Sequence, residues 1–183
     1  MARSFQNLGI MAEETVLTNV MARLHVSAEY GPLDPWVRSG RVRRREAALL
    51  ARAHEAMHAM GLDNYAHTPV RNLSFGLARR AEVAGLLATS PRLLLLDEPT
   101  AGLSGPATED LFRALRTVQE ERGVTVLIIA HDLNFVMAFA RRVVVMAEGR
   151  VIARGTPDAV RRDPQVVEAY LGTGGERAAL EVA

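Results

Sequence analysis

Apolar residues recur at helical spacing through the first half of the chain. Residues 15–26 predict a short amphipathic helix, and the Gly-Pro-Leu-Asp-Pro stretch at 31–35 then predicts a break, because proline cannot continue a helix. A second helix is predicted over 43–60, with Gly61 placed to act as its left-handed cap. A third follows Ser74, whose hydroxyl can cap the first turn.

The pattern changes after Pro91. Residues 93–96 are four consecutive leucines, and residues 124–130 form a second apolar run that is rich in β-branched side chains. Short continuous apolar runs are typical of strands covered on both faces, as in a parallel sheet. A helix predicted over 107–121 lies between them, which gives a βαβ unit.

The last third of the chain predicts shorter elements. Asp132 can cap a helix that runs to 142, and a third strand over 143–147 leads through a Glu-Gly turn into 151–153. Thr156 and Pro157 are typical of a helix start. The predicted fold class is therefore α/β, and we expect the tail from 173 to 183 to fray.

Composition limits the function. The 183 residues, 49% of them hydrophobic, suit one compact domain. No apolar run approaches the roughly 18 residues of a membrane span, and the start lacks the apolar segment of a secretory signal, so we expect a cytoplasmic protein.

With no cysteine there is no disulfide or thiolate site, and a net charge of +1 gives no field for nucleic acid. All 22 residues counted as Lys or Arg are arginine.

Two adjacent acids, Asp97 and Glu98, end the first predicted strand. Ligands of open α/β folds bind at the carboxyl edge of a parallel sheet, where such charge is expected. Successive strand residues face opposite ways, so one acid can hold Mg²⁺ while the other orients and deprotonates water. An exposed acidic turn is the simpler explanation of the pair taken alone.

The neighbouring motifs favour the catalytic explanation. Residues 93–103, Leu-Leu-Leu-Leu-Asp-Glu-Pro-Thr-Ala-Gly-Leu, resemble the Walker B motif and D-loop of ATP-binding-cassette (ABC) ATPases. The Leu-Ser-Phe-Gly-Leu of 73–77, followed by Arg79 and Arg80, resembles the family's signature motif. His131 stands where the switch histidine belongs, and Gln6 matches the Q-loop. The resemblance covers nearly the whole chain, and the four motifs occur in the family's order.

This resemblance implies a fold of P-loop ATPase type, an ATP site that contains Mg²⁺, and hydrolysis between two stacked subunits. Asp97 would hold Mg²⁺, Glu98 would act as general base, and His131 would contact the γ-phosphate. Gln6 would sense Mg²⁺ and the γ-phosphate. Ser74 and Gly76 would contact the partner's γ-phosphate from a helix N-terminus.

Several positions depart from the family pattern. Leu77 replaces a glutamine, which we expect to weaken nucleotide affinity by about 1 kcal/mol because leucine cannot hydrogen-bond the ribose. Ser104, in the nucleotide-binding D-loop, and Gly105 stand where an acid or amide would directly precede proline. Without lysine the chain cannot contain a Walker A lysine, so the sequence resembles an N-terminally truncated cassette. We expect such a chain to have low stability by itself, and to hydrolyse ATP only if another polypeptide supplies the phosphate cradle.

The expected organisation is a partial ABC domain over 1–183, with a helical subdomain over 14–90 and a catalytic core over 91–172. Residues 149–157 and 163–172 resemble importers of branched-chain and other hydrophobic amino acids, and transporters of urea or lipopolysaccharide are an alternative. The implied partners are a second cassette, integral permeases and, indirectly, a substrate-binding protein. The chain would lie on the inner face of the cell membrane. An ABC module in DNA repair or translation is a further alternative, but the chain shows no long insertion.

Two other patterns need separate explanations. His54-Glu55-Ala-Met-His58 matches the H-E-x-x-H motif of zinc metalloproteases, but Asn64 stands where a third ligand is required. The arginines at 41 and 43–45 predict a solvated helix face, with contact to anionic lipid headgroups as an alternative.

Overall fold

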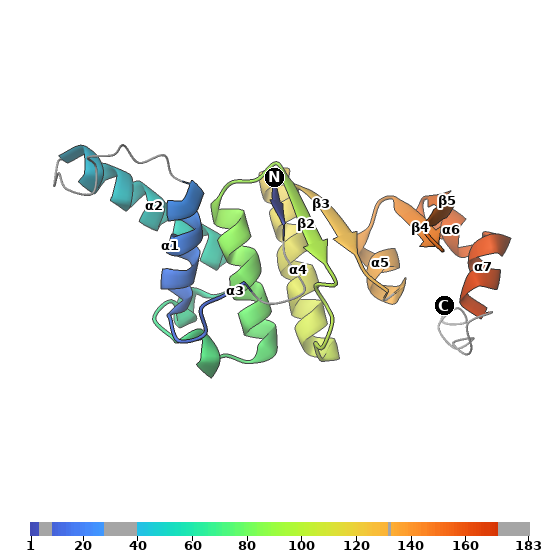
Figure 1. The fold of residues 1–183 in the computed structure, drawn as a ribbon, viewed down its shortest axis with the longest axis horizontal. Helices are drawn as coiled ribbons and strands as arrows, with labels where there is room; N and C mark the ends of the chain where they lie inside the picture. The colour runs from blue at the N-terminus through green and yellow to red at the C-terminus, as the bar shows by residue number, and fades with distance from the viewer. Residues whose placement is uncertain (4–8, 28–39, 132, 172–183) are drawn as a thin grey trace. The chain divides into compact units, whose positions relative to one another are not determined.

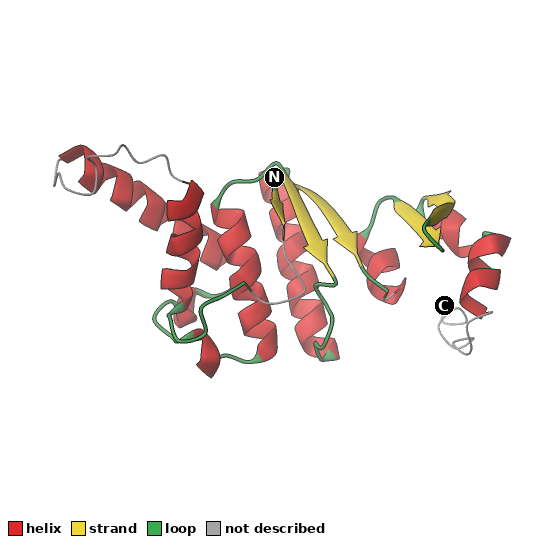
Figure 2. Cartoon of the chain, in the orientation of Figure 1, coloured by secondary structure: helices red, strands yellow, loops and turns green. Residues whose placement is uncertain are grey.

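The computed structural model describes residues 1–3, 9–27, 40–131 and 133–171. The chain divides into two compact units, Met1–Ile129 and Ala130–Ala183. Both contain helices and strands, as Figure 2 shows by colour. The α/β class expected from the sequence is confirmed.

Three long helices make up the first half of unit 1. They are α1 (Val16–Ser27), α2 (Gly40–Ala59) and α3 (Phe75–Ala88). Each lies within about one turn of its predicted range, and Gly61 has the left-handed φ of 64° that was predicted for the cap of α2. Their apolar faces bury one another and include Val20, Leu24, Met57, Met60, Ala84 and Leu87.

A parallel sheet lies beside these helices (Figure 1). Its order is β1 (Ala2–Arg3), β2 (Leu93–Asp97) and β3 (Thr125–Ile129), with β2 and β3 in register from Leu93 opposite Thr125 to Asp97 opposite Ile129. The connection from β2 to β3 is α4 (Gly105–Arg122), which ends at Gly123 with φ 61°. The predicted βαβ unit is confirmed, whereas the short β1 was not predicted.

The sheet buries one face much more than the other. Leu94 and Leu96 of β2 are 0% and 1% exposed, whereas Leu127 and Ile129 of β3 are 55% and 60% exposed. The prediction that both strands are covered on both faces is therefore wrong for β3 within the described residues. Alternate strand residues point to opposite faces, and an unbroken apolar run does not reveal which face has a covering layer.

Unit 2 is a hairpin packed with short helices. These elements are α5 (Leu133–Phe139), β4 (Val143–Ala147), β5 (Arg150–Gly155), α6 (Pro157–Arg161) and α7 (Pro164–Leu171). β4 pairs antiparallel with β5 through a turn in which Glu148 and Gly149 have φ of 49° and 75°. Val143, Ala153, Val160 and Val166 form the core.

These elements can be compared with the predictions for unit 2. The helix predicted to reach residue 142 ends at Phe139, and its predicted cap, Asp132, lies outside the described residues. The predicted start at Thr156 is confirmed, because the Thr156 side chain accepts a hydrogen bond from the Ala159 amide at 3.3 Å.

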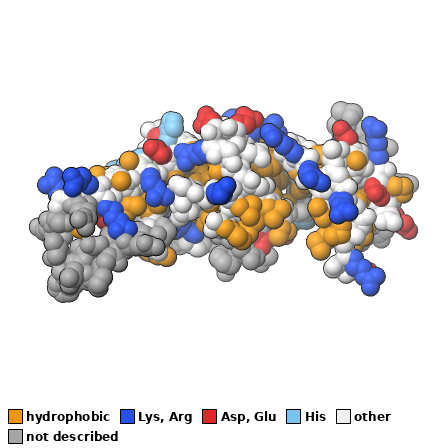
Figure 3. All heavy atoms as spheres, turned by 90° about the horizontal axis from the view of Figure 1, so that it is seen from above, with side chains coloured by type: hydrophobic (Ala, Val, Ile, Leu, Met, Phe, Trp, Pro, Cys, Tyr) orange, Lys and Arg blue, Asp and Glu red, His pale blue; other side chains and the backbone are white. Residues whose placement is uncertain are grey.

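The surface of α2 carries the arginine cluster noted in the sequence. Arg43 and Arg44 are exposed near the start of this helix, where Figure 3 shows basic side chains gathered. None of the helices that the structure describes is both long enough and apolar enough to span a bilayer.

Candidate functional site at the carboxyl end of β2

The two predicted catalytic carboxylates lie where β2 ends. Asp97 is the last residue of the strand, in register with Ile129 of β3, and Glu98 follows it. The Glu98 amide donates a 2.7 Å hydrogen bond to the Ile129 carbonyl, which extends the pairing one step beyond the strand. Both acids are half-buried, so their charges lie at a sheet edge that is accessible to a ligand.

The backbone turns sharply at Glu98. Its φ is 45°, in the left-handed region that side-chain-bearing residues seldom adopt. The Ala101 amide donates to the Glu98 carbonyl at 3.1 Å and the Leu103 amide to the Thr100 carbonyl at 3.0 Å, while Gly102 has φ 75°. A strained non-glycine residue held by its surroundings is typical of functional sites. We call residues 98–103 the Glu98 turn.

The signature-like segment forms the N-terminus of α3. Ser74 is the N-cap, and its Oγ accepts a hydrogen bond from the Leu77 amide at 3.3 Å, as the sequence predicted. The serine is exposed, and unpaired amides of a first helical turn, with the positive end of the helix dipole, can bind a phosphate group.

Gly76 has a packing role that the sequence did not reveal. A Cβ atom at Gly76 would lie 2.9 Å from the Cβ of Ala107 in α4 and 3.9 Å from Cδ2 of Leu103. The first separation is shorter than real Cβ contacts allow, so glycine lets the start of α3 approach the start of α4. Ser104 is exposed at the N-cap of α4, where its carbonyl accepts from the Thr108 amide at 2.9 Å but its side chain makes no capping bond.

Phe75 and Arg79 belong to the signature-like segment, but their contacts in this site were not predicted. The Phe75 ring contacts the Glu98 turn at Gly102, and the Arg79 guanidinium carbon lies 5.8 Å from the ring centroid. Arg79 is buried and donates to Glu82 at 2.9 Å. These contacts depend on the distance between α3 and the Glu98 turn in the folded chain, and no sequence pattern gives that distance.

Two further predicted residues lie outside the described part of unit 1. His131 is exposed and belongs to unit 2, two residues after the end of β3. Gln6 lies outside the described residues. Unit 1 therefore brings together the signature-like segment and the Glu98 turn, through contacts of Phe75 and Gly76.

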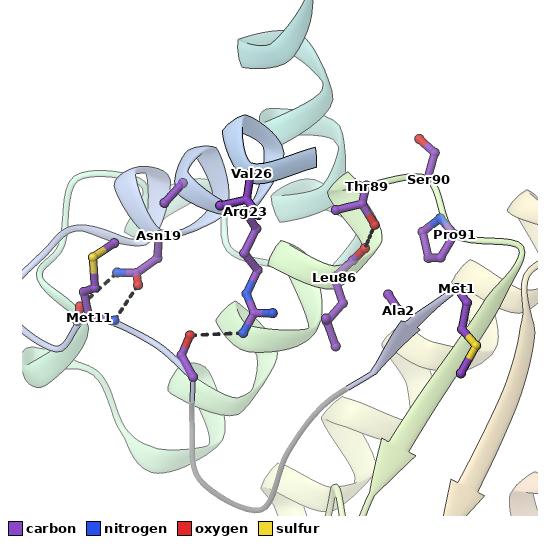
Figure 4. Close-up of a pocket in the computed structure, with 12 residues that line it drawn as sticks. Met1, Ala2, Met11, Asn19, Arg23, Val26, Leu86, Thr89, Ser90 and Pro91 are labelled. Atoms are coloured by element: carbon purple, nitrogen blue, oxygen red, sulfur yellow. Dashed lines mark hydrogen bonds between the residues drawn. The ribbon is translucent and has the colours of Figure 1, made fainter. Parts of the chain in front are cut away.

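A separate cavity of about 690 Å³ opens in unit 1 between α1, the end of α3 and β1 (Figure 4). Its lining is largely apolar and includes Met11, Val26 and Leu86. Arg23 crosses it and donates to the Gly9 carbonyl at 3.0 Å. Among the described residues, those predicted for the nucleotide site do not line this cavity.

The chain matches known proteins over most of its length. The family model described as ABC transporter matches residues 1–101. The high-affinity branched-chain amino acid transport ATP-binding protein LivG of Escherichia coli strain K12 is 34% identical over 170 residues, which cover 93% of this chain and 67% of LivG. The chain belongs to the ABC transporter family, as an ABC-type ATPase.

Two further matches are to proteins of branched-chain amino acid transport. A model described as branched-chain amino acid ATP-binding cassette transporter matches residues 150–176 of this ABC ATPase. BraF of Pseudomonas aeruginosa, another high-affinity branched-chain amino acid transport ATP-binding protein, is 35% identical over 93% of the chain and 67% of its own length.

Solved ABC cassettes have the same fold. The ADP conformation of MJ1267, an ATP-binding cassette of an ABC transporter, superposes with a TM-score of 0.75 at 26% identity over 93% of this chain and 68% of MJ1267. The dimeric cassette MJ0796 superposes at 0.66, with 26% identity over 86% of this chain and 62% of its own. The predicted fold and family are confirmed.

Asp97 is the residue of this site that could hold Mg²⁺. No group of three or more His, Cys, Asp or Glu side chains placed to hold a metal occurs in the described ranges. Mg²⁺ needs no such cage, because it is bound by one or two carboxylates together with phosphate oxygens and water. The Asp97 carboxylate at the sheet edge fits this requirement.

The zinc-protease alternative gains no support. His54, Glu55 and His58 lie exposed on α2, and Nδ1 of His58 is 2.9 Å from Oδ1 of Asp63. The matched relatives LivG and BraF are named as transport ATP-binding proteins.

Proposed function

We propose that this ABC ATPase is the energy-coupling subunit of an importer for branched-chain or other hydrophobic amino acids. The match of residues 150–176 to the branched-chain amino acid cassette model is the observation that supports this substrate class. The names of LivG and BraF agree with it. The proposed partners are a second cassette, permease subunits at the inner face of the membrane and, through them, a substrate-binding protein.

Ser74 and Gly76 would contact a nucleotide bound by the partner cassette. The exposed N-terminus of α3 supports this role, because Ser74 leaves its hydroxyl accessible while its oxygen accepts only the weak 3.3 Å bond from Leu77. The phosphate-binding lysine for that nucleotide would belong to the partner cassette.

Asp97 and Glu98 would serve the chemical step. Mg²⁺, held by Asp97 and the phosphate oxygens, would neutralise charge that develops on the transferred phosphoryl group. Glu98 would accept a proton from the attacking water, and the left-handed turn places its carboxylate just beyond the strand end. His131 and Gln6 would contact the γ-phosphate, and Ser104 would border the nucleotide at the D-loop.

Uptake of labelled substrates tests the proposal. Deleting the gene in its own host should lower the uptake of leucine and valine, and restoring the wild-type gene, but not the Glu98→Gln variant, should recover it. Unchanged leucine and valine uptake, with loss of urea uptake instead, would contradict the proposed substrate class.

A further inference from the structure

The N-terminus of α3 lies against the Glu98 turn. A Cβ atom at Gly102 would lie 3.2 Å from Cε1 and 3.8 Å from Cζ of Phe75. A Cβ atom at Gly76 would likewise lie 3.9 Å from Cδ2 of Leu103. Gly102 also has φ 75°, so this position combines a left-handed backbone with an aromatic ring that a larger residue would press against.

The Phe75 ring also lies against a buried charge. The guanidinium of Arg79 lies 5.8 Å from the ring centroid, at a separation where a cation attracts the face of an aromatic ring. The Arg79 and Glu82 side chains are only 5% and 0% exposed, and their 2.9 Å ion pair fixes the arginine. Phe75 itself remains 47% exposed, as several other large apolar side chains of the described residues do.

The ring thus lies between the buried Arg79 guanidinium and Gly102 of the Glu98 turn. We propose that Phe75 is a positioning residue that joins the buried Arg79–Glu82 pair to Gly102 and so fixes the Glu98 turn. The turn begins at Glu98, whose carbonyl accepts from the Ala101 amide. A ring that holds Gly102 thereby holds the backbone from which the Glu98 carboxylate projects.

Hydrogen exchange of the full chain tests this inference without any need for ATP hydrolysis. Phe75→Ala should speed exchange of the Ala101 and Leu103 amides by about ten-fold or more, because local opening of the turn becomes easier. Phe75→Tyr keeps the ring and should exchange like wild type. Leu50→Ala is the matched control, since Leu50 is a 40% exposed apolar residue in the same unit, on α2.

The inference is overturned if Phe75→Ala leaves the exchange rates of the turn amides unchanged. It is also overturned if Phe75→Ala raises these rates no more than Leu50→Ala does. If Phe75→Ala loses protection throughout β2 as well, the Gly102→Ala and Phe75→Leu variants decide the matter. Gly102→Ala should destabilise the wild-type chain more than the Phe75→Leu chain, because the smaller side chain relieves the 3.2 Å contact. Equal effects in both backgrounds would refute the contact.

A kinetic measurement in the transporter complex extends the test and rests on the proposed function. Phe75→Ala should lower kcat and leave the KM for ATP unchanged, because Glu98 acts in the chemical step. Phe75→Tyr should restore kcat. A rise in KM with constant kcat would show that Phe75 contacts nucleotide instead and would contradict the positioning role. Absence of hydrolysis in the wild-type complex would count against the proposed function, while the exchange result would still decide the inference.

Discussion

At the residue scale, Gly76 serves the packing of two helices as well as its proposed phosphate contact. A Cβ atom added at this position would lie 2.9 Å from the Cβ of Ala107, which leaves no space for a methyl group. Gly76→Ala should therefore lower the free energy of unfolding by about 1–3 kcal/mol through overpacking.

The Ala107→Gly variant provides the control for this packing. It should cost about 0.5–1 kcal/mol alone, and the double variant should be more stable than the sum of the two single effects predicts, since the clashing methyl group is gone. Chemical denaturation measures all three. Strict additivity would show that the two positions do not contact.

Glu98 is a second residue whose conformation can be tested. Its φ of 45° is one that glycine adopts at little cost, so Glu98→Gly should raise the free energy of unfolding by about 0.5–1 kcal/mol, whereas Glu98→Gln should leave it unchanged. Glu148, with φ 49° in the β4–β5 turn, is the matched control. Glu148→Gly should raise the free energy of unfolding of unit 2 by a similar amount. It should not lower the ATPase activity of the complex. Destabilisation by Glu98→Gly would contradict the strained turn.

The sequence predicted much of the site at this scale because Ser74, Asp97 and Glu98 occur in motifs with fixed chemistry. Their elements were confirmed, although their roles in catalysis and binding stay predictions. Phe75, Arg79 and the packing of Gly76 could not be predicted, because each depends on distances between segments that are separate in the chain. The left-handed Glu98 is likewise a property of the folded turn.

At the element scale, the sheet differs from the prediction because one face of β3 is exposed rather than covered. Leu94 and Leu127 are leucines of neighbouring paired strands, 0% and 55% exposed. Leu94→Ala should cost about 2–5 kcal/mol of unfolding free energy, because it leaves a cavity. Leu127→Ala should cost less than about 1 kcal/mol.

Denaturant titration followed by circular dichroism compares these two variants. Equal losses would show that β3 is covered by something that the described residues do not include. The period of apolar positions predicted helices and strands within a few residues, since local geometry sets that period. It could not assign covered faces, because these depend on contacts between elements, whereas the Glu-Gly turn did indicate the hairpin of β4 and β5.

At the scale of the whole molecule, membership of the ABC family comes from ordered motifs, from the matched relatives and from a common fold. The relatives LivG and BraF are matched over 67% of their own length. The chain contributes an exposed helix N-terminus at Ser74 and a carboxylate pair at Asp97 and Glu98. In a stacked pair of cassettes, Ser74 would act on the partner's nucleotide and Glu98 on a nucleotide at its own side.

Ser74 and Thr156 allow the central claim to be tested with one comparison. Both are exposed N-caps that accept a backbone hydrogen bond at 3.3 Å, from Leu77 and Ala159. Replacing either with alanine should cost about 1 kcal/mol of stability. Only Ser74 is proposed to contact phosphate, so the two variants separate capping from nucleotide contact.

The decisive measurement is the ATPase rate of this chain purified in complex with its partner cassette and permease. Ser74→Ala should lower the rate by about ten-fold or more, through loss of a hydrogen bond to a charged phosphate, and Thr156→Ala should leave it near the wild-type value. Equal rates in the two variants would contradict the claim that this chain completes an ATP site between two ABC subunits.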